Sequence, residues 1–448
     1  MSCVALASAV TLAGCQKEEL MENQFNTEFS PTANQTGQVI DGQYIVVFKN
    51  GAGSLNAVGI SEMSTLDRGA VRMRERTLQA AHIENSDLVQ TFDGAVNGFA
   101  ARLTSAQVAA LKNNPEVAYI EQDRIISLGF WDDFLNKFSG KTKTFNPKKP
   151  TKPAPEPTPA PAPEPTPEPT PEPTPEPTPE PVTAPAAYTA ITPLAGENVP
   201  WNIQRTGYGD GTGKTVWIID SGVDTDHPDL NVDLARSKSF IYGVTSVEDG
   251  FGHGTSVAGV VAAKNNGSGM IGVAANATVV ALRVFDDAGQ GTVSRAISAV
   301  NHVISNAQPG DVVNMSLGSG ISSTLDNAVR TAAGKGILFA VAAGNSAVDC
   351  SGTSPARVDA DGVYTVSAMD SYNRLWEKSN YGLSVDFAAP GVNVTVTTKN
   401  GSIGGGAYGT SFAAPHVAGI LLLRGTVYTQ GTITGDKDST PDPIAALE

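Results

Sequence analysis

The stretch Gly405-Gly-Ala-Tyr-Gly-Thr-Ser-Phe-Ala-Ala-Pro-His-Val-Ala-Gly419 places one serine, Ser411, on a glycine-flanked turn that runs directly into an apolar segment. The residues that follow are dense enough in Ala, Val, Ile and Leu for a buried helix, which we expect to begin at about Ser411. Pro415 is then expected in the first turn, where a missing N–H is tolerated. A serine in this place can be a simple helix cap. It can also be a nucleophile whose own N–H and helix dipole stabilise an oxyanion.

Three further stretches favour the catalytic interpretation, because each brings one polar side chain to the end of an apolar strand or the start of a small-residue helix. They are Val-Trp-Ile-Ile-Asp-Ser-Gly with Asp220, Gly-His-Gly-Thr-Ser-Val-Ala-Gly with His253, and Phe-Ala-Val-Ala-Ala-Gly-Asn with Asn345. The Ser411 segment closely resembles the nucleophile motif of the subtilisin family of serine proteases, in its proteinase K branch. The other stretches resemble the aspartate, histidine and oxyanion-hole asparagine motifs of that family. The resemblance implies a serine endopeptidase.

A serine hydroxyl needs a base to take its proton, and that base needs a buried carboxylate to fix its tautomer. His253 is the best candidate base. The other histidines are expected in a turn, on helices or in the N-terminal region: His227, His302, His416 and His82. Asp220 is the best carboxylate because it directly follows a buried strand. The aspartates nearby are expected to be exposed in turns: Asp224, Asp226 and Asp229.

Further site residues are implied by the same resemblance. Two segments resemble the walls of the primary specificity pocket, and their small residues favour a roomy, apolar pocket: Ser316, Leu317, Gly318 and Ala342, Ala343, Gly344. Gly289 and Gly291 lie where the family pairs a peptide as an extra strand. The Val363 carbonyl and Asp386 align with a calcium site of oxygen ligands, so Ca²⁺ is the expected metal. Cys350 has no expected disulfide partner and is expected to be a buried or weakly reactive thiol.

The fold class expected from residue 199 to 448 is α/β, with a doubly wound, mostly parallel sheet. Apolar strands alternate with helical periodicity there, and both faces of the sheet must be covered. The expected strands are Lys214–Ile219, Thr278–Phe285, Asp311–Leu317, Ile337–Ala343 and Val363–Ala368. Active sites in such sheets lie beyond the carboxyl ends of the strands, where Asp220 and Asn345 are placed.

Residues 38–130 predict a separate small α+β domain with a β-α-β-β-α-β-like, ferredoxin-like pattern. Asn97-Gly-Phe-Ala-Ala and Tyr119-Ile-Glu-Gln-Asp123 resemble the inhibitor-type prodomain of subtilisins. The resemblance implies that this domain is the enzyme's own folding chaperone and inhibitor. It also implies a first cut between about Leu128 and Trp131, with Phe130–Trp131 the preferred bond and a cut near Tyr188–Val199 the alternative.

The remaining segments are low in core-forming residues. Residues 131–198 form a linker built on Pro-Glu-Pro-Thr repeats, for which an extended spacer is favoured over a partner-docking ligand. Residues 16–37 are polar and are expected to be a flexible spacer. Residues 1–15 end in Leu12-Ala-Gly-Cys15, which resembles a bacterial lipobox and implies export with a lipid on Cys15. An ordinary secretory signal is the alternative.

Composition excludes some classes of function. The formal charge of -15 argues against nucleic acid as a partner. No apolar run reaches the roughly 20 residues needed to span a bilayer, so the membrane is expected to be contacted only through Cys15. A lipase of the α/β-hydrolase type would need Gly-x-Ser-x-Gly and the order Ser, Asp, His. A catalytically silent, peptide-binding relative anchored at the cell surface is the main alternative, but none of the four motifs is broken.

Overall fold

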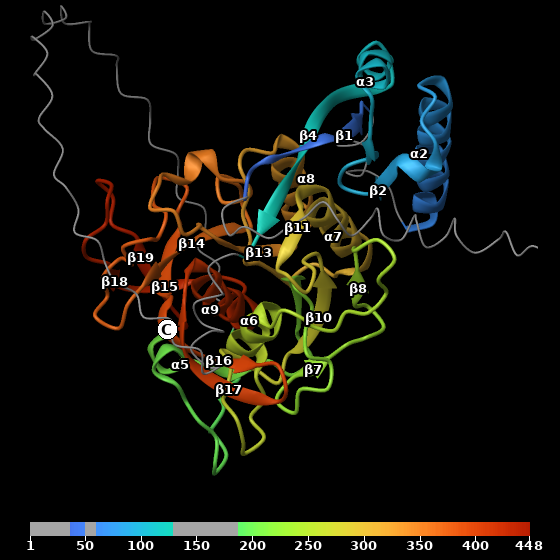
Figure 1. The fold of residues 1–448 in the computed structure, drawn as a ribbon. Helices are drawn as coiled ribbons and strands as arrows, with labels where there is room; N and C mark the ends of the chain where they lie inside the picture. Colours follow the sequence, from blue (N-terminus) through green and yellow to red (C-terminus); the bar gives the residue numbers. More distant parts are fainter. Residues whose placement is uncertain (1–35, 50–59, 129–186) are drawn as a thin grey trace, which may run out of the picture.

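The computed structural model describes residues 36–49, 60–128 and 187–448. Two folded regions are visible, an N-terminal domain in blue and cyan and a larger C-terminal domain in green to red (Figure 1). The predicted signal with Cys15, most of the polar spacer, the Pro-Glu-Pro-Thr repeats and the Phe130–Trp131 bond lie outside the described residues. Within the described residues, no helix is both long and apolar enough to cross a bilayer.

The N-terminal domain has the predicted β-α-β-β-α-β order. Its elements are β1 (Val39–Phe48), α2 (Ile60–Ala80), β2 (Leu88–Phe92), β3 (Gly98–Arg102), α3 (Ser105–Lys112) and β4 (Val117–Ser127). Alternate side chains of β1 and β3, with Leu111 of α3, form a small separate core. Order begins earlier than the sequence predicts, because Thr36 and Gly37, assigned to the spacer, pair with β4.

The C-terminal domain is built on a ten-stranded, mostly parallel sheet, which confirms the predicted fold class. Its central strands are β10 (Thr278–Arg283), β6 (Thr215–Asp220), β12 (Val312–Met315), β13 (Leu338–Ala342), β14 (Val363–Met369) and β15 (Phe387–Pro390). The edges are β7 (Asn231–Val232), β8 (Lys238–Ser239), β19 (Pro443–Ala446) and β18 (Tyr428–Thr432). Every residue of β6 and β12 is buried, so both faces of the sheet are covered.

Helices cover the sheet in two pairs. The helix α6 (His253–Ala262) packs against α9 (Thr410–Arg424), and α7 (Val293–Asn306) packs against α8 (Ser323–Ala333) (Figure 1). The strands β10 and β12 lie on either side of β6, so the strand order reverses there. The carboxyl end of β6, where Asp220 lies, is therefore the crevice in which doubly wound sheets place their active sites.

Two details of the fold differ from the sequence-based predictions. Pro415 is the sixth residue of α9 and lies in its second turn, because the helix already begins at Thr410. The end of the predicted linker, residues 187–198, belongs to the folded domain. Tyr188 packs against the guanidinium of Arg424 at 4.9 Å from the ring centroid, and the Leu194 N–H donates to the Asn265 side chain.

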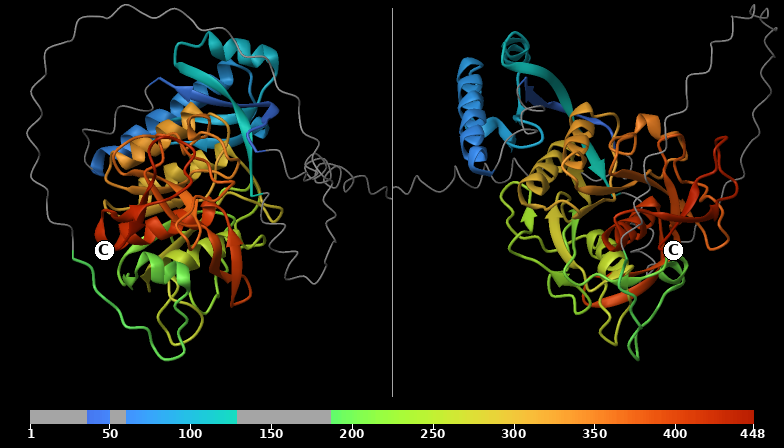
Figure 2. Two further views of the ribbon diagram at one scale, coloured as in Figure 1. Left: turned by 90° about the vertical axis from the view of Figure 1, so that its left-hand side faces the viewer. Right: turned by 180° about the vertical axis from the view of Figure 1, so that it is seen from behind.

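The two domains share a sheet and an interface. The short strand β11 (Gln290–Thr292) of the C-terminal domain pairs antiparallel with the end of β4, which gives the order β11-β4-β1-β3-β2. Figure 2 shows the N-terminal domain lying against the part of the other domain that contains α7 and α8. Asp123 accepts from the Ser294 N–H and Glu121 from the Thr324 N–H. These β4 carboxylates therefore lie at the N-termini of α7 and α8, where helix dipoles favour negative charge.

Candidate active site

Asp220 and His253 form a buried pair. Asp220 is the last residue of β6, and His253 is the first residue of α6, after Gly252 with a φ of 109°. The His253 Nδ1 lies 2.8 and 2.9 Å from the two Asp220 carboxylate oxygens, and the two residues are 3% and 0% exposed. Because a carboxylate can only accept, Nδ1 carries the hydrogen. The Nε2 atom is then left to accept a proton.

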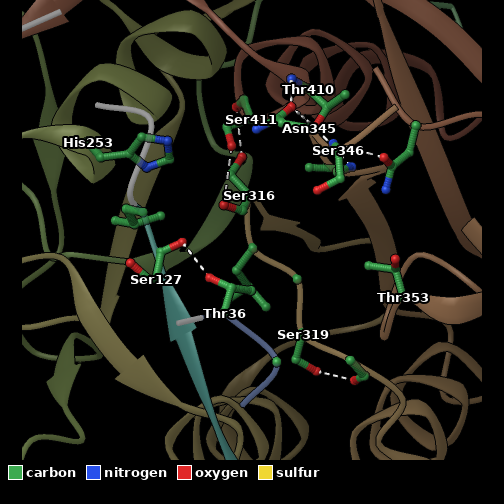
Figure 3. Close-up of a pocket in the computed structure, with 18 of the residues that line it drawn as sticks. Thr36, Ser127, His253, Ser316, Ser319, Asn345, Ser346, Thr353, Thr410 and Ser411 are labelled. Atoms are coloured by element: carbon green, nitrogen blue, oxygen red, sulfur yellow. Dashed lines mark hydrogen bonds between the residues drawn. The ribbon is translucent and has the colours of Figure 1, made fainter. Parts of the chain in front are cut away.

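Ser411 shares a cavity with His253. It is the second residue of α9, and it lines a cavity of about 520 Å³ together with His253 and Asn345. Figure 3 shows the His253 ring and the Ser411 side chain on neighbouring edges of this cavity. The Phe412 ring packs against the His253 ring with 5.4 Å between centroids. The structure therefore brings the three predicted residues of the triad to one site.

Asn345 is held by its side-chain oxygen. The Oδ1 atom accepts from the Thr410 N–H at 2.9 Å and from the Thr410 hydroxyl at 2.8 Å. Because Oδ1 is occupied, the Nδ2 group is oriented as a donor. Asn345 lies three residues after the end of β13, and Thr410 comes from α9. The pairing fixes the Asn345 side chain against Thr410, the neighbour of Ser411, and Asn345 and Ser411 line the same cavity. An amide donor is the kind of group that an oxyanion hole uses.

Asp249 is a site residue that the sequence analysis missed. One carboxylate oxygen accepts from the Ser221 hydroxyl and the Gly252 N–H, and the other accepts twice from Thr255. Burial raises the pKa of the Asp249 carboxyl, while these donors act in the opposite direction. The Ser221 N–H in turn donates to Asp220 at 2.7 Å. Asp249 therefore connects the start of α6 to the Asp220 carboxylate through Ser221. Its position four residues before His253 is the sequence feature that could have identified it.

The pocket beside Ser411 has small but partly polar walls. The predicted wall residues that line it are Ser316, Leu317, Gly318, Ala342 and Gly344. Ala343 is fully buried and is absent from the lining, because its neighbours face the pocket instead. Hydroxyl groups of Ser319, Ser346 and Thr353 also line the pocket. The cavity walls thus combine the small residues that the sequence analysis named with hydroxyl-bearing side chains, so they are less apolar than the Ala and Gly residues suggested.

Gly289 and Gly291 lie beside the tail of the N-terminal domain. Gly291 is opposite Ile126 in the pairing of β11 with β4, and the Gly289 carbonyl accepts from the Leu128 N–H at 3.0 Å. Leu128 lines the same cavity as His253 and Ser411. The described end of β4 therefore reaches the candidate active site as an added strand, at the start of the predicted cleavage window.

The other histidines of the C-terminal domain and Cys350 are packed as structural groups. His416 is fully buried between Phe412 and Asn202, and burial lowers its pKa to about 4. His227 contacts the Ser402 carbonyl and His302 contacts the Arg236 carbonyl, and neither histidine lines the cavity that contains Ser411. Cys350 is buried, and burial raises the pKa of its thiol to about 12. Such a thiol is not a nucleophile at neutral pH.

Two of the three neighbouring aspartates are not exposed, which corrects the prediction for them. Asp224 accepts from the Asn400 N–H, and Asp229 accepts from the Met270 N–H; both are nearly fully buried, whereas Asp226 is exposed. Burial raises the pKa of Asp229 to about 6, and the carboxylate of Glu197 adds to the shift. The backbone donors of folded loops, which a sequence pattern does not reveal, make this burial possible.

Two places offer oxygen atoms suited to a hard cation. Asp386 accepts from the Thr365 N–H, and burial, with the Asp359 carboxylate, raises its pKa to about 6; Val363 begins the adjacent strand. The second place is around Glu197, whose Oε1 is buried without a partner. The described residues contain no group of three acidic, histidine or cysteine side chains placed to hold a metal. A cation at Asp386 would therefore need carbonyl oxygens or water as its other ligands, which is the kind of oxygen set that calcium takes.

Comparisons with known proteins find matches for both domains of the chain. Residues 211–434 match the model of the subtilase family, and residues 43–129 match that of peptidase inhibitor I9. The chain is 33% identical over 332 residues to alkaline serine exoprotease A of Vibrio alginolyticus, covering 74% of this chain and 52% of that protein. It is 40% identical over 241 residues to the alkaline protease of Alkalihalobacillus alcalophilus, covering 52% and 61%. The chain thus spans less than two thirds of the length of these two relatives.

One further sequence relative and one solved structure are similar to part of the chain. Subtilisin Savinase of Lederbergia lenta is 40% identical over 235 residues, covering 51% of this chain and 84% of that protein. Among solved structures, the crystal structure of a cold adapted subtilisin-like serine proteinase is 32% identical, with a TM-score of 0.49. That match covers 56% of this chain and 99% of the other.

Proposed function

The chain belongs to the subtilase family, and on this basis we propose that it is a serine endopeptidase made as an autoprocessed zymogen. The observation that carries the proposal is the buried pair of Asp220 and His253 lying in one cavity with Ser411. Protein and peptide chains are the substrates. The cleft supports this choice because it already accepts one extended strand of the chain itself, paired with β11.

In the proposed reaction, the Ser411 Oγ attacks the carbonyl carbon of the scissile peptide bond while His253 Nε2 takes its proton. Asp220 holds the imidazole in the required tautomer and stabilises the imidazolium. The Asn345 Nδ2 and the Ser411 N–H stabilise the negative oxygen of the tetrahedral intermediate. His253 then gives the proton to the leaving amine, which leaves an acyl-enzyme. Water activated by His253 hydrolyses the acyl-enzyme and restores Ser411.

Labelling by a fluorophosphonate probe tests the proposed activity. The matured protein should bind the probe covalently, and Ser411→Ala should not. Ser351→Ala is the matched control, because Ser351 is an exposed serine outside the cavity lining and should leave labelling unchanged. Equal labelling of Ser411→Ala and the parent would reject the assignment, and absent labelling of both would favour a catalytically silent, peptide-binding protein.

The N-terminal domain is proposed to be the enzyme's own inhibitor, since residues 43–129 match an inhibitor family and β4 ends in the cleft. We propose that the first cut falls between about Leu128 and Trp131, so that the Pro-rich linker stays with the enzyme. The lipid on Cys15 would then stay with the inhibitor, and degradation of the inhibitor would release the enzyme from the cell envelope. N-terminal sequencing of the mature enzyme tests this: a start near Trp131 supports the model, whereas a start beyond Pro185 contradicts it.

Calcium is proposed as a structural ion held by the Val363 carbonyl and Asp386. Bound there, calcium would supply a positive charge that links β14 to the loop before β15. The raised pKa of the Asp386 carboxyl supports this, because burial disfavours the anion unless a cation is near.

A further inference from the structure

Three residues that precede β1 pair with the tail of the N-terminal domain through their backbone. We call Thr36–Gln38 the N-terminal flank and Ile125–Leu128 the tail. The Gly37 N–H donates to the Ile125 carbonyl at 2.8 Å, and the Ile125 N–H donates to the Gln38 carbonyl at 2.9 Å. The Thr36 hydroxyl donates to the Ser127 carbonyl at 3.3 Å. Because β11 pairs with the opposite edge, the tail is a central strand with partners on both sides.

The N-terminal flank lies between the tail and the pocket wall, which we define as Ser316–Gly320. A Cβ atom placed on Gly37 would lie 3.0 Å from the Gly320 nitrogen, so the two backbones are in close contact. All three flank residues line the same cavity as His253 and Ser411. Figure 3 shows Thr36 bonded to Ser127 on the side that faces Ser316 and Ser319. Among the described residues, no backbone hydrogen bond joins the tail to the pocket wall.

The position of the flank depends on specific residues. Gly37 has a φ of 86°, which only glycine adopts without strain. The Gly37 carbonyl accepts from the Arg124 guanidinium at 2.7 Å, so β4 contributes a side chain to hold the flank. A peptide paired along one edge exposes unpaired backbone groups along the other. The flank satisfies that second edge of the tail and separates it from the pocket wall.

We propose that the N-terminal flank is a second inhibitory segment, which strengthens the hold of the tail on the cleft. In the zymogen, Thr36–Gln38 then covers the pocket wall at Gly320, where the two backbones are in close contact. This inference rests on the proposed function of the chain as an autoprocessed zymogen. It adds to the inhibitor domain a latch, Thr36–Gln38, that must leave the cavity before substrate can occupy it fully.

The rate of activation of the full-length chain tests the proposal, with Gly37→Ala and Gly42→Ala as matched variants. Both glycines have positive φ, but a Cβ on Gly42 would approach only the Leu103 carbonyl, at 4.0 Å and outside the cleft. We expect Gly37→Ala to shorten the lag before activity toward a short chromogenic peptide appears by about tenfold, which corresponds to about 1.4 kcal/mol. Gly42→Ala should keep the parent lag. An unchanged lag in Gly37→Ala, or equal shortening in both variants, overturns the proposal.

Hydrogen exchange in the Ser411→Ala chain provides a test that does not depend on activity. The Ile125 amide donates to the flank, whereas the Leu128 amide donates to Gly289. Adding Gly37→Ala should speed exchange at Ile125 severalfold and leave Leu128 unchanged. If Gly37→Ala does not fold, Arg124→Met replaces it, because it removes the side chain that holds the Gly37 carbonyl and leaves the backbone unchanged. It should also speed exchange at Ile125. Unchanged exchange at Ile125 in the folded variants overturns the proposed latch. If the parent chain never becomes active, the proposed function is overturned instead.

Discussion

The Ser411 carbonyl accepts a hydrogen bond from the Ser316 hydroxyl, with 2.8 Å between the oxygens. Pro415, four residues after Ser411, has no N–H to donate, so the usual intrahelical bond to this carbonyl cannot form. The Ser316 side chain supplies the missing donor, and the Asn314 side chain donates to Ser316 in turn. The backbone of the proposed nucleophile is thereby fixed to the wall of the substrate pocket.

This relationship predicts a coupling between Ser316 and Pro415. Ser316→Ala leaves the Ser411 carbonyl without a donor and should lower the free energy of unfolding by about 1–2 kcal/mol. In a Pro415→Ala background the helix can supply its own N–H, so the same change should cost less. Urea unfolding of the four proteins, with His253→Ala in each to prevent autolysis, measures the difference. Equal costs in both backgrounds would contradict the explanation.

The triad residues should act as one unit. Ser411→Ala, His253→Ala and Asp220→Asn should each nearly abolish cleavage of casein, and the double variants should be no worse than the single ones. Asn345→Leu should lower kcat by about 100- to 1000-fold, because one oxyanion donor is lost. The Ser411→Ala and His253→Ala chains should also remain full-length, because neither can cut itself. A Ser411→Ala protein that cleaves casein at the parent rate would reject the assignment.

Asp249 should act as a positioning residue for His253. Asp249→Asn replaces an acceptor of four hydrogen bonds with a group that can accept at only one oxygen, so the start of α6 must shift. We expect kcat to fall on the order of 100-fold with little change in KM, as for other small displacements of catalytic groups. Asp226→Asn, at an exposed carboxylate, is the control. A parent-like kcat in Asp249→Asn would show that this network does not position the base.

Calcium should raise the thermal midpoint of the protein if it binds at Val363 and Asp386. Midpoints in excess calcium and in excess chelator should then differ for the parent and coincide for Asp386→Ala. Glu197→Gln removes a carboxylate at the second candidate place, so comparing the two variants shows which place binds calcium. If the calcium response survives in Asp386→Ala but disappears in Glu197→Gln, the proposed site is wrong, and if the parent midpoints coincide, calcium is not bound.

Asp442 should make the protein less stable as the pH rises. Its carboxylate is buried, accepts from the Ser367 hydroxyl at 2.5 Å, and has its pKa raised to about 7 by burial and by nearby Asp436 and Asp438. The folded state therefore keeps a proton that the unfolded state has lost between about pH 4 and 7. Stability should fall through that window by on the order of 1 kcal/mol per pH unit.

The variant Asp442→Asn tests this assignment, because an amide resembles the protonated acid and still accepts from Ser367. Its thermal midpoint, measured in chelator, should exceed that of the parent at pH 8 and match it near pH 4. If the parent is as stable as Asp442→Asn at pH 8, the raised pKa of the Asp442 carboxyl is contradicted.

The sequence by itself determined the fold class, the small N-terminal domain and the four motifs that meet at the candidate site. These features depend on local patterns: apolar strands ended by a polar residue, glycines around Ser411, and helical periodicity after it. Such patterns act over a few residues and can therefore be read before the chain is folded. The same locality explains the errors, since Asp229 looks like an exposed turn residue until the donor of Met270 is brought to it.

Only the tertiary structure decided how distant segments complete one another. The donor for the Ser411 carbonyl comes from Ser316, and the segment that pairs with the tail comes from Thr36–Gln38 at the start of the described chain. Neither relationship leaves a signal in sequence spacing, because each depends on two backbones that approach after folding. The physical reason is the need of buried backbone groups for partners: once the sheet and helices are packed, the nearest available donor or acceptor satisfies them, wherever it lies in the sequence.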